Sequence, residues 1–184
     1  GLSQHFVIYD TQDQLDAIKD AMKNLNLSTK EYKPSSVLNT ISQAKNELIS
    51  DIDYPKYARG HFQETVSQVY RVYQHILKEN EALDFDDLMM RTAMLFSQNP
   101  QILKKYQDRF VYILVDEYQD TNHAQYYLSK ILAQKWHNIC VVGDFAQSIY
   151  SWRGADFTNL TKFKDDFKNA KTFALSQNYR STQT

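Results

Sequence analysis

Three short apolar runs, each about as long as one β-strand, constrain the fold of this chain more than any other feature. They cover residues 110–115, 139–142 and 172–175, and helix-like stretches over 123–134 and 155–167 separate them. Near-continuous apolar runs of this length are typical of strands that are buried on both faces of a parallel sheet. Because the expected strands alternate with expected helices, crossover connections between parallel strands are favoured. The second part of the chain is therefore expected to be an α/β domain.

The first part of the chain has the apolar spacing of helices. Apolar residues recur every three or four positions from 15 to 25, and Thr11 precedes them in a capping-box pattern with Gln14. Further helices are expected after Pro34, over 61–78, over 85–96 and after Pro100. We therefore expect a mostly helical subdomain over 1–108 and an α/β domain with a parallel sheet over 109–184.

Composition and charge narrow the class of protein. Of the 184 residues, 42% are hydrophobic and 23% are charged, which is typical of a globular chain. No run approaches the roughly 18 apolar residues that a membrane span needs, so no membrane partner is expected. The single cysteine, Cys140, excludes an internal disulfide and a cysteine-based zinc cluster, which fits a cytoplasmic location. The net charge of −1 lacks the basic surplus of proteins that bind DNA mainly through phosphates, so any contact with nucleic acid must be local or depend on stacking.

Two carboxylates, Asp116 and Glu117, directly follow the first apolar run. Ligands bind at the carboxyl ends of the strands in open α/β sheets, so a site is expected here. Adjacent residues of an extended chain point to opposite sides, which lets one carboxylate bind hydrated Mg²⁺ while the other orients a water. An ordinary acidic turn after a strand has the same pattern, and the pair alone does not distinguish the two.

A second group of polar and aromatic residues follows the second apolar run. It begins with Asp144 and Gln147 and continues with Tyr150, Trp152 and Arg153. An amide can hydrogen-bond a terminal phosphate, and a tryptophan can stack on an unpaired base without reading its sequence. A tryptophan packed in the core is the alternative for Trp152.

A third group, Tyr179 and Arg180, follows the third apolar run. An arginine at this edge can point at the charge that develops on a transferred phosphate. The tyrosine beside it can stack on a purine. A surface arginine is the alternative when this pair is considered alone.

Together, the three groups resemble the UvrD/Rep/PcrA family of superfamily 1 DNA helicases. The matching patterns are Asp-Glu-x-Gln-Asp-Thr-Asn at 116–122, Gly-Asp-x-x-Gln-Ser-Ile-Tyr-x-Trp-Arg-Gly-Ala at 143–155, Gln-Asn-Tyr-Arg-Ser at 177–181 and, upstream, Asp-Phe-Asp-Asp-Leu at 84–88. The resemblance implies a partial RecA-like sheet of the P-loop NTPase type in the second part. It also implies that the helical part is the family's inserted subdomain 1B, which lies near the DNA.

The resemblance assigns each matching residue at the nucleotide a role. Asp116 would hold Mg²⁺, and Glu117 would orient and deprotonate the attacking water. Gln147 would contact the γ-phosphate of ATP, and Arg180 would act on that phosphate in the manner of an arginine finger. Tyr179 would stack on the adenine. ATP and Mg²⁺ are thus the implied cofactors.

On the DNA side, the resemblance implies that Tyr150, Trp152 and Arg153 meet single-stranded DNA, with Trp152 as a stacking step in translocation. Gln119 and Asp120 are expected to couple the DNA and nucleotide sites through hydrogen bonds. The implied partners are single-stranded DNA, junctions of duplex and single strand, and proteins of DNA repair or replication. Translocation would be driven by ATP hydrolysis and run 3′ to 5′.

The sequence lacks the pattern Gly-x-x-x-x-Gly-Lys-[Ser/Thr], whose loop cradles phosphates. We therefore expect the chain to be part of a longer helicase and to hydrolyse little ATP alone. In this family, the strand before that loop lies between the strands expected at 139–142 and 172–175. The sheet should therefore have a gap, or a displaced strand that pairs with another copy of the chain. Ala146 stands where many family members have an acidic residue, and we expect it to tune activity rather than abolish it.

A non-catalytic module that binds DNA or a repair partner is the alternative from another class. It would use Trp152, Tyr150 and the helical part of the chain. The pair of Asp116 and Glu117 argues against it, since a binding module has no need of both. A plain α/β scaffold would have to carry helicase-like patterns at three strand ends by coincidence.

Overall fold

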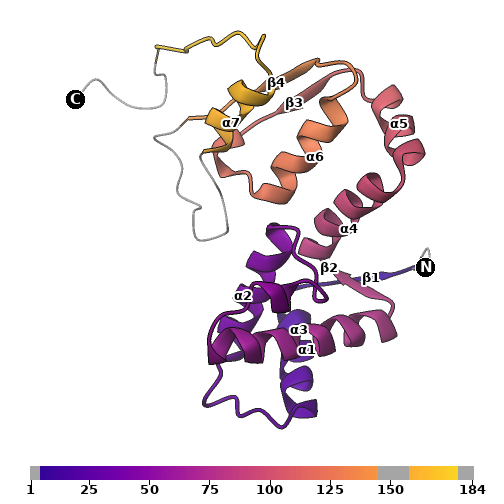
Figure 1. Cartoon of the computed structure of the whole chain (residues 1–184), viewed down its shortest axis with the longest axis vertical. Helices are drawn as coiled ribbons and strands as arrows, with labels where there is room; N and C mark the ends of the chain where they lie inside the picture. Colours follow the sequence, from indigo (N-terminus) through magenta and orange to yellow (C-terminus); the bar gives the residue numbers. More distant parts are fainter. Residues whose placement is uncertain (1–4, 145–157, 178–184) are drawn as a thin grey trace.

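The computed structural model describes residues 5–144 and 158–177, and these form two lobes joined by helix α4 (Figure 1). The lower lobe in Figure 1 holds helices α1–α3 with strands β1 and β2, and the upper lobe holds β3, β4, α6 and α7. The described chain is mixed α/β and mostly helical, with two small parallel sheets. No helix in these ranges is long and apolar enough to cross a membrane.

The lower lobe is a group of helices around a two-stranded parallel sheet. Its elements are β1 (Val7–Tyr9), α1 (Thr11–Asn24), α2 (Pro34–Asn46), the 3-10 turn η1 (Tyr54–Lys56), α3 (His61–Glu79) and β2 (Ala82–Asp84). Val7 of β1 lies opposite Ala82 of β2, so the chain leaves this lobe beside the point where it enters. A continuous apolar core fills the space between the helices and includes Ile18, Val37 and Val69, which are fully buried.

The start of α1 differs from the prediction by one residue. Asp10, and not Thr11, is the N-cap, and its side chain accepts hydrogen bonds from the backbone N–H groups of Gln12 at 2.8 Å and Asp13 at 2.9 Å. The side chain of Asp13 accepts from the N–H of Asp10 at 3.0 Å and completes the capping box. The carboxylates of Asp10 and Asp13 also lie at the positive end of the helix dipole. This favours a capping box formed by Asp10 and Asp13 over one formed by Thr11 and Gln14.

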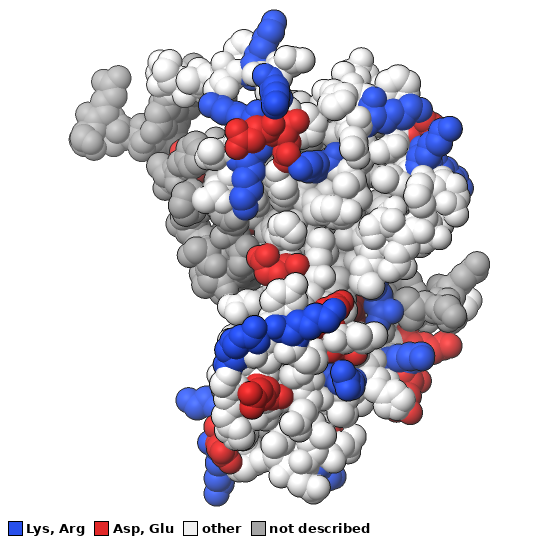
Figure 2. Space-filling view, in the orientation of Figure 1, with Lys and Arg blue, Asp and Glu red and all other residues white. Residues whose placement is uncertain are grey.

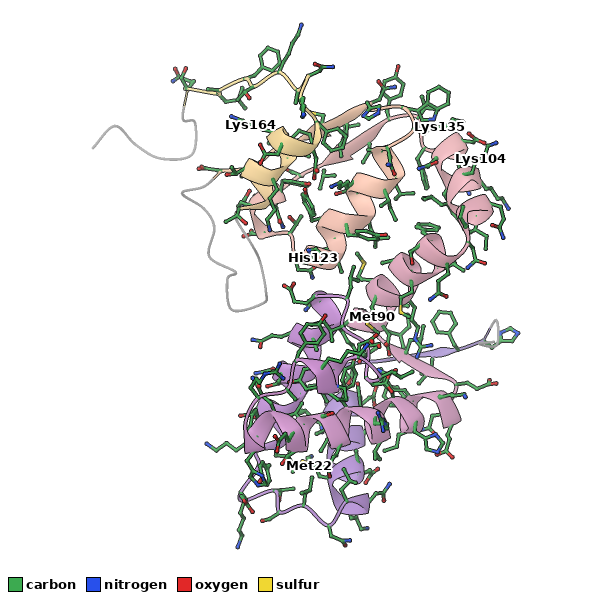
Figure 3. The ribbon with its side chains drawn as sticks, in the orientation of Figure 1. Met22, Met90, Lys104, His123, Lys135 and Lys164 are labelled. Carbon is green, nitrogen blue, oxygen red and sulfur yellow. The ribbon has the colours of Figure 1, made fainter. Side chains whose placement is uncertain are left out.

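Helix α4 packs against both lobes. The linking elements are α4 (Phe85–Gln98) and α5 (Pro100–Arg109). Met90 of α4 is buried at the junction between the lobes (Figure 3). Farther along the helix, Ala93 and Phe96 pack with Leu128 and Ile131 of α6 in a second apolar core. Both linking helices lie where the sequence predicts them, and α4 packs against α2 of the lower lobe and α6 of the upper lobe.

The upper lobe contains a two-stranded parallel sheet with α6 and α7 on one face (Figure 1). Its elements are β3 (Ile113–Val115), the 3-10 turn η2 (Tyr118–Asp120), α6 (His123–Ala133), β4 (Ile139–Val141) and α7 (Asn159–Asp166). A small core lies between the sheet and these helices, formed by Tyr118, Tyr126 and Phe163 with Val115, Ile139 and Val141 against it. The predicted crossover, in which α6 joins two parallel strands, is therefore confirmed.

The prediction that these strands are buried on both faces is wrong. Leu114 is 79% exposed and Cys140 is exposed, because no described element covers the second face of the sheet. The strand predicted over 172–175 is also wrong, since this stretch has no regular structure and Phe173 and Leu175 are 83% and 93% exposed. A strand requires a neighbour to receive its backbone hydrogen bonds, and apolar content alone does not supply one.

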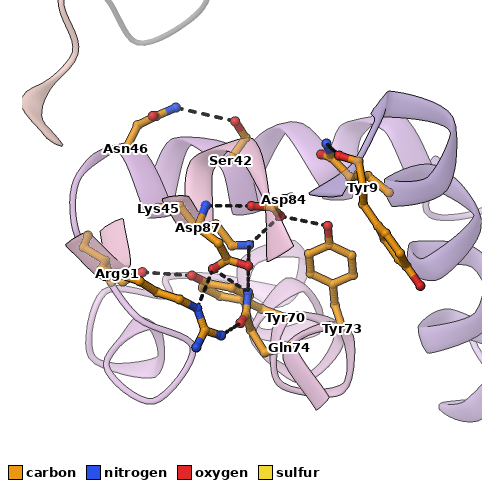
Figure 4. Close-up of polar contacts among 12 residues, drawn as sticks. Tyr9, Ser42, Lys45, Asn46, Tyr70, Tyr73, Gln74, Asp84, Asp87 and Arg91 are labelled. Carbon is orange, nitrogen blue, oxygen red and sulfur yellow. Dashed lines mark hydrogen bonds and ion pairs between the residues drawn. The ribbon is translucent and has the colours of Figure 1, made fainter. Parts of the chain in front are cut away.

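A cluster of charged side chains is buried between α2, α3 and the start of α4 (Figure 4). Lys45 is fully buried, and its Nζ lies 2.5 Å from Asp84 Oδ2 and 3.1 Å from Asp87 Oδ2. The Tyr73 hydroxyl donates to Asp84 at 2.8 Å, and burial together with that carboxylate raises the pKa of Tyr73, so the donor keeps its proton. The Nε of Arg91 lies 3.6 Å from Asp87 Oδ1 and adds a second, partly exposed cation at the edge of the cluster.

Replacing Lys45 with methionine should destabilise the lower lobe strongly. Lys45→Met keeps the apolar stem but leaves two buried carboxylates without their main cation, and we expect the free energy of unfolding to fall by about 3–5 kcal/mol. Equilibrium urea unfolding, followed by circular dichroism, measures the change. Lys19→Met is the matched control, because the pair of Lys19 and Asp16 is exposed and its loss should cost less than about 1 kcal/mol. Equal losses in the two variants would contradict this account.

Candidate functional site

The candidate site lies at the carboxyl end of β3, where Asp116 and Glu117 begin a tight turn. Both residues are exposed. Glu117 has a left-handed backbone, with φ 49° and ψ 42°, and its N–H donates to Asp116 Oδ1 at 2.9 Å. The next residue, Tyr118, donates its N–H to the carbonyl of Val142 at 2.8 Å, which fixes the turn to the end of β4. A non-glycine residue in the left-handed region costs about 1–3 kcal/mol. Four other described non-glycine residues share a positive φ, so the conformation shows a tight turn here and does not by itself mark a functional site: Asn26, Leu48, Glu81 and His137.

Gln119 joins this turn to the chain that follows β4. Its side chain is buried, and its Nε2 donates to Glu117 Oε2 at 2.7 Å. The same nitrogen lies 3.4 Å from Asp120 Oδ2. The amide oxygen, Oε1, accepts the backbone N–H of Asp144 at 3.0 Å. One side chain therefore positions the carboxylate of Glu117 and the start of the second motif at the same time.

Gly143 allows this amide to approach the end of β4. A Cβ atom at this position would lie 2.8 Å from Gln119 Oε1 and 3.3 Å from Leu160 Cδ1. The shorter distance is below any contact that a real Cβ atom makes, so a side chain at 143 would push Gln119 away. The glycine is thus part of the same arrangement as the hydrogen bond between Gln119 and Asp144.

Two further amides bind the other end of the turn. Asn159, the first residue of α7, is fully buried, and its Nδ2 donates to the carbonyl oxygen of Thr121 at 3.0 Å. Asn122 caps α6 by accepting the N–H of Gln125 at 2.9 Å, and its Nδ2 donates to Asn46 Oδ1 at 2.7 Å. Because Asn46 ends α2, the turn is bonded to the lower lobe as well as to α7.

The charged side chains of the turn itself are acidic, namely Asp116, Glu117 and Asp120. On the face shown in Figure 2, Lys and Arg side chains are interspersed with Asp and Glu, in agreement with the net charge of −1. Burial raises the pKa of Tyr118, so the phenol beneath the turn stays neutral. Within residues 5–144 and 158–177, no group of three or more acidic, histidine or cysteine side chains could hold a metal ion.

The structure places four of the predicted site residues in one turn. These four residues follow β3 directly, and the Gln119 side chain donates hydrogen bonds to Glu117 and to Asp120. The four are Asp116, Glu117, Gln119 and Asp120. The other predicted residues lie outside the described part of the chain, namely Gln147, Tyr150, Trp152, Arg153, Tyr179 and Arg180. The roles of all ten residues stay predictions.

Sequence reasoning missed the residues that hold the turn from outside. The cap at Asn122 could have been found, because Gln125 follows it with the spacing of a capping box. The contact between Asn159 and Thr121 joins residues 38 positions apart, and that between Asn46 and Asn122 joins residues 76 apart. Neither contact has a local pattern that would reveal it.

Comparison with known proteins adds independent information. Residues 1–168 match the UvrD/REP helicase N-terminal domain. The chain is 52% identical over 183 residues to the ATP-dependent DNA helicase PcrA of Bacillus subtilis, and 50% identical over 184 residues to the PcrA of Staphylococcus aureus. It is 50% identical over 183 residues to the PcrA of Leuconostoc citreum. Each match covers the whole of this chain, which spans about a quarter of the length of these relatives.

Gly143→Ala should displace Gln119 and lower stability. We expect the free energy of unfolding to fall by about 1–3 kcal/mol, because buried hydrogen bonds of Gln119 are strained or lost. Urea unfolding measures the change. In a Gln119→Ala background the new methyl group no longer meets the amide oxygen, so the same substitution should cost less than about 1 kcal/mol. Additive effects of the two substitutions would show that Gly143 and Gln119 are independent.

Proposed function

The chain belongs to the UvrD/REP helicase family, and on this premise we propose that it is part of an ATP-dependent DNA helicase. The whole protein would couple ATP hydrolysis to 3′-to-5′ translocation along single-stranded DNA and to duplex unwinding in repair or replication. The observation that carries the proposal is the turn after β3, where the amide of Gln119 bonds both the carboxylate of Glu117 and the backbone of Asp144. A module that only binds has no need of a carboxylate held in this way.

Glu117 is the general base in this proposal. Its Oε2 accepts the hydrogen bond from Gln119, and its second oxygen receives the proton of the attacking water. The hydrogen bond restricts rotation of the carboxylate, so less entropy is lost when the water is oriented for attack. The link to Gln119 thus holds the proposed base in a fixed position.

The nucleotide is bound by residues from all three motifs. Gln147 hydrogen-bonds the γ-phosphate, Arg180 neutralises the charge that develops on it, and Tyr179 stacks on the adenine, by family resemblance. Asp116 fits a ligand for Mg²⁺, because it is an exposed carboxylate at a strand end and this ion usually takes one or two carboxylates with water and phosphate oxygens. When bound, Mg²⁺ would neutralise charge on the phosphates.

Single-stranded DNA would be bound through stacking more than through a basic surface. Tyr150, Trp152 and Arg153 are the proposed contacts, and stacking on an aromatic side chain contributes about 1–3 kcal/mol per base. This mode agrees with the mixed charges of Figure 2 and with the net charge of −1. Junctions of duplex and single strand, and partner proteins of repair or replication, would be met by the whole helicase in the cytoplasm.

We also propose that residues 1–108 form a subdomain like 1B and residues 109–184 part of a RecA-like ATPase domain. The crossover through α6, with the site at the carboxyl end of β3, supports the second assignment. Leu114 and Val142 leave an apolar surface open on the free face and edge of this sheet. The rest of a RecA-like domain would pack there, and the same surface offers a route to self-association of the chain.

Glu117→Gln tests the assignment of the base. In the full-length protein with single-stranded DNA, this variant should hydrolyse ATP about a hundredfold more slowly or worse, because an amide cannot accept the proton. Its affinity for ATP should be retained. Phosphate release and a nucleotide titration measure the two quantities.

Glu79→Gln is the matched control for this test. Glu79 is exposed at the end of α3 and pairs with His75, so its variant should keep the wild-type rate. Wild-type turnover by Glu117→Gln would show that another group deprotonates the water.

The 184-residue chain by itself should show negligible ATP hydrolysis. It has the proposed base and metal ligand but no phosphate-binding loop to place the phosphates beside them. Phosphate release is measured with and without Mg²⁺ and single-stranded DNA. Robust magnesium-dependent turnover by this chain would refute the expectation.

A further inference from the structure

We propose that Asn159 is a positioning residue that couples DNA binding to ATP hydrolysis, by bonding the start of α7 to the turn that follows Glu117. The inference rests on the proposed function, since it concerns the regulation of that site. It adds a residue that none of the helicase-like motifs contains.

The geometry of Asn159 is that of a committed hydrogen-bond donor. The residue is 0% exposed, and its Nδ2 lies 3.0 Å from the carbonyl oxygen of Thr121 and 3.2 Å from Thr121 Oγ1. The Thr121 hydroxyl in turn donates to the carbonyl of Tyr118 at 2.7 Å. The amide of Asn159 therefore binds the end of the same short turn whose first residues follow Glu117.

Asp144, near the start of the second motif, is also hydrogen-bonded to this turn. The N–H of Asp144 donates to Gln119 Oε1, and Gln119 Nε2 donates to Glu117 Oε2. Asp144 and Asn159 flank residues 145–157, which include the proposed γ-phosphate and DNA contacts. The two flanking residues thus bond to one turn, and in this proposal a shift that bound DNA imposes on either of them reaches Glu117 through these hydrogen bonds.

Holding α7 in place does not by itself require Asn159. Phe163 of α7 packs edge-on against Tyr118 with ring centroids 5.8 Å apart, and Leu160 lies against Gly143. These apolar contacts supply attraction without a strict direction, and at the other end of the helix Asp166 accepts hydrogen bonds from the Tyr126 hydroxyl and from Lys130 Nζ. A buried amide adds little net stability because it loses its water, but its hydrogen bonds are made in one arrangement only. The bonds of Asp166 hold the end of α7 on α6, whereas the bonds of Asn159 hold the start of α7 on the turn, and this is the position that we propose Asn159 to set.

Asn159→Asp in the full-length protein tests the proposal. The substitution keeps the shape of the side chain but replaces the Nδ2 donor with a carboxylate oxygen facing the carbonyl of Thr121. We expect the fold-stimulation of ATP hydrolysis by single-stranded DNA to fall about tenfold, the change that corresponds to one buried hydrogen bond of ~1.4 kcal/mol.

A pH series separates positioning from simple damage to the fold. Burial raises the pKa of a carboxyl group, and once protonated, the carboxyl group introduced by Asn159→Asp could again donate to the carbonyl of Thr121. The stimulation of the variant, relative to wild type at the same pH, should therefore recover as the pH falls. Because protonation also removes the buried charge that lowers stability, unfolding is measured at each pH, and recovery of stimulation while the folded fraction stays constant separates positioning from damage to the fold.

Phe163→Leu is the matched control on the same helix. It weakens the packing of α7 on Tyr118 but leaves the amide of Asn159 in place, so stimulation should stay near the wild-type value below the melting temperature of the variant. If Asn159→Asp does not fold, Asn159→Ala replaces it, with the same expected loss of stimulation.

Two results would overturn the proposal. One is wild-type stimulation in the Asn159 variant, and the other is an equal loss in Phe163→Leu. Absence of stimulation in the wild-type protein is a different result, because it would overturn the proposed function itself and this inference with it.

Discussion

The buried ion cluster around Lys45 is the constraint on which the rest of the structure depends. Its charges are paired only when α2 meets the start of α4, because an unpaired charge in this position would be strongly unfavourable. Helix α3 adds neutral donors to the same carboxylates through Tyr73 and Gln74. Asp84 also caps α4 by accepting the N–H of Asp87 at 2.7 Å, so the direction of the linking helix is set at the same point. The next residue after Lys45 is Asn46, whose side chain reaches Asn122. The polar contacts of the lower lobe thus extend to the candidate site.

The turn after β3 is where these constraints meet. Gln119 bonds the turn to the end of β4, where Gly143 leaves room for its amide. Asn159 bonds the turn to α7, and Asn122 bonds it to α2. Each bond is made by an amide with a definite direction, and the apolar core of Tyr118 lies beneath them. Such a turn can hold Glu117 in its strained backbone, because several contacts together offset the cost. In the proposed function, the same contacts carry a signal from bound DNA to the catalytic carboxylate.

Sequence reasoning succeeded where the signal is local and failed where it depends on neighbours. The helix starting at His61 and the one starting at Phe85 were predicted because their apolar spacing and end residues lie within the segment itself. The short strand β2 was missed, since three residues carry no periodicity and pair with β1 more than 70 positions away. The apolar stretch around Phe173 is predicted as a strand and is not one, because no strand within residues 5–144 and 158–177 pairs with it.

The sequence by itself determined the family, the order of the motifs, and the residues Asp116, Glu117, Gln119 and Asp120 as one group at a strand end. It did so because these residues are contiguous, and a contiguous pattern can be read without knowing the fold. Tertiary structure alone decided which distant atoms meet, such as Lys45 with Asp84 across 39 positions and Asn159 with Thr121 across 38. The reason is physical: a hydrogen bond or ion pair acts over about 3 Å, and only the packed core brings such groups within that range.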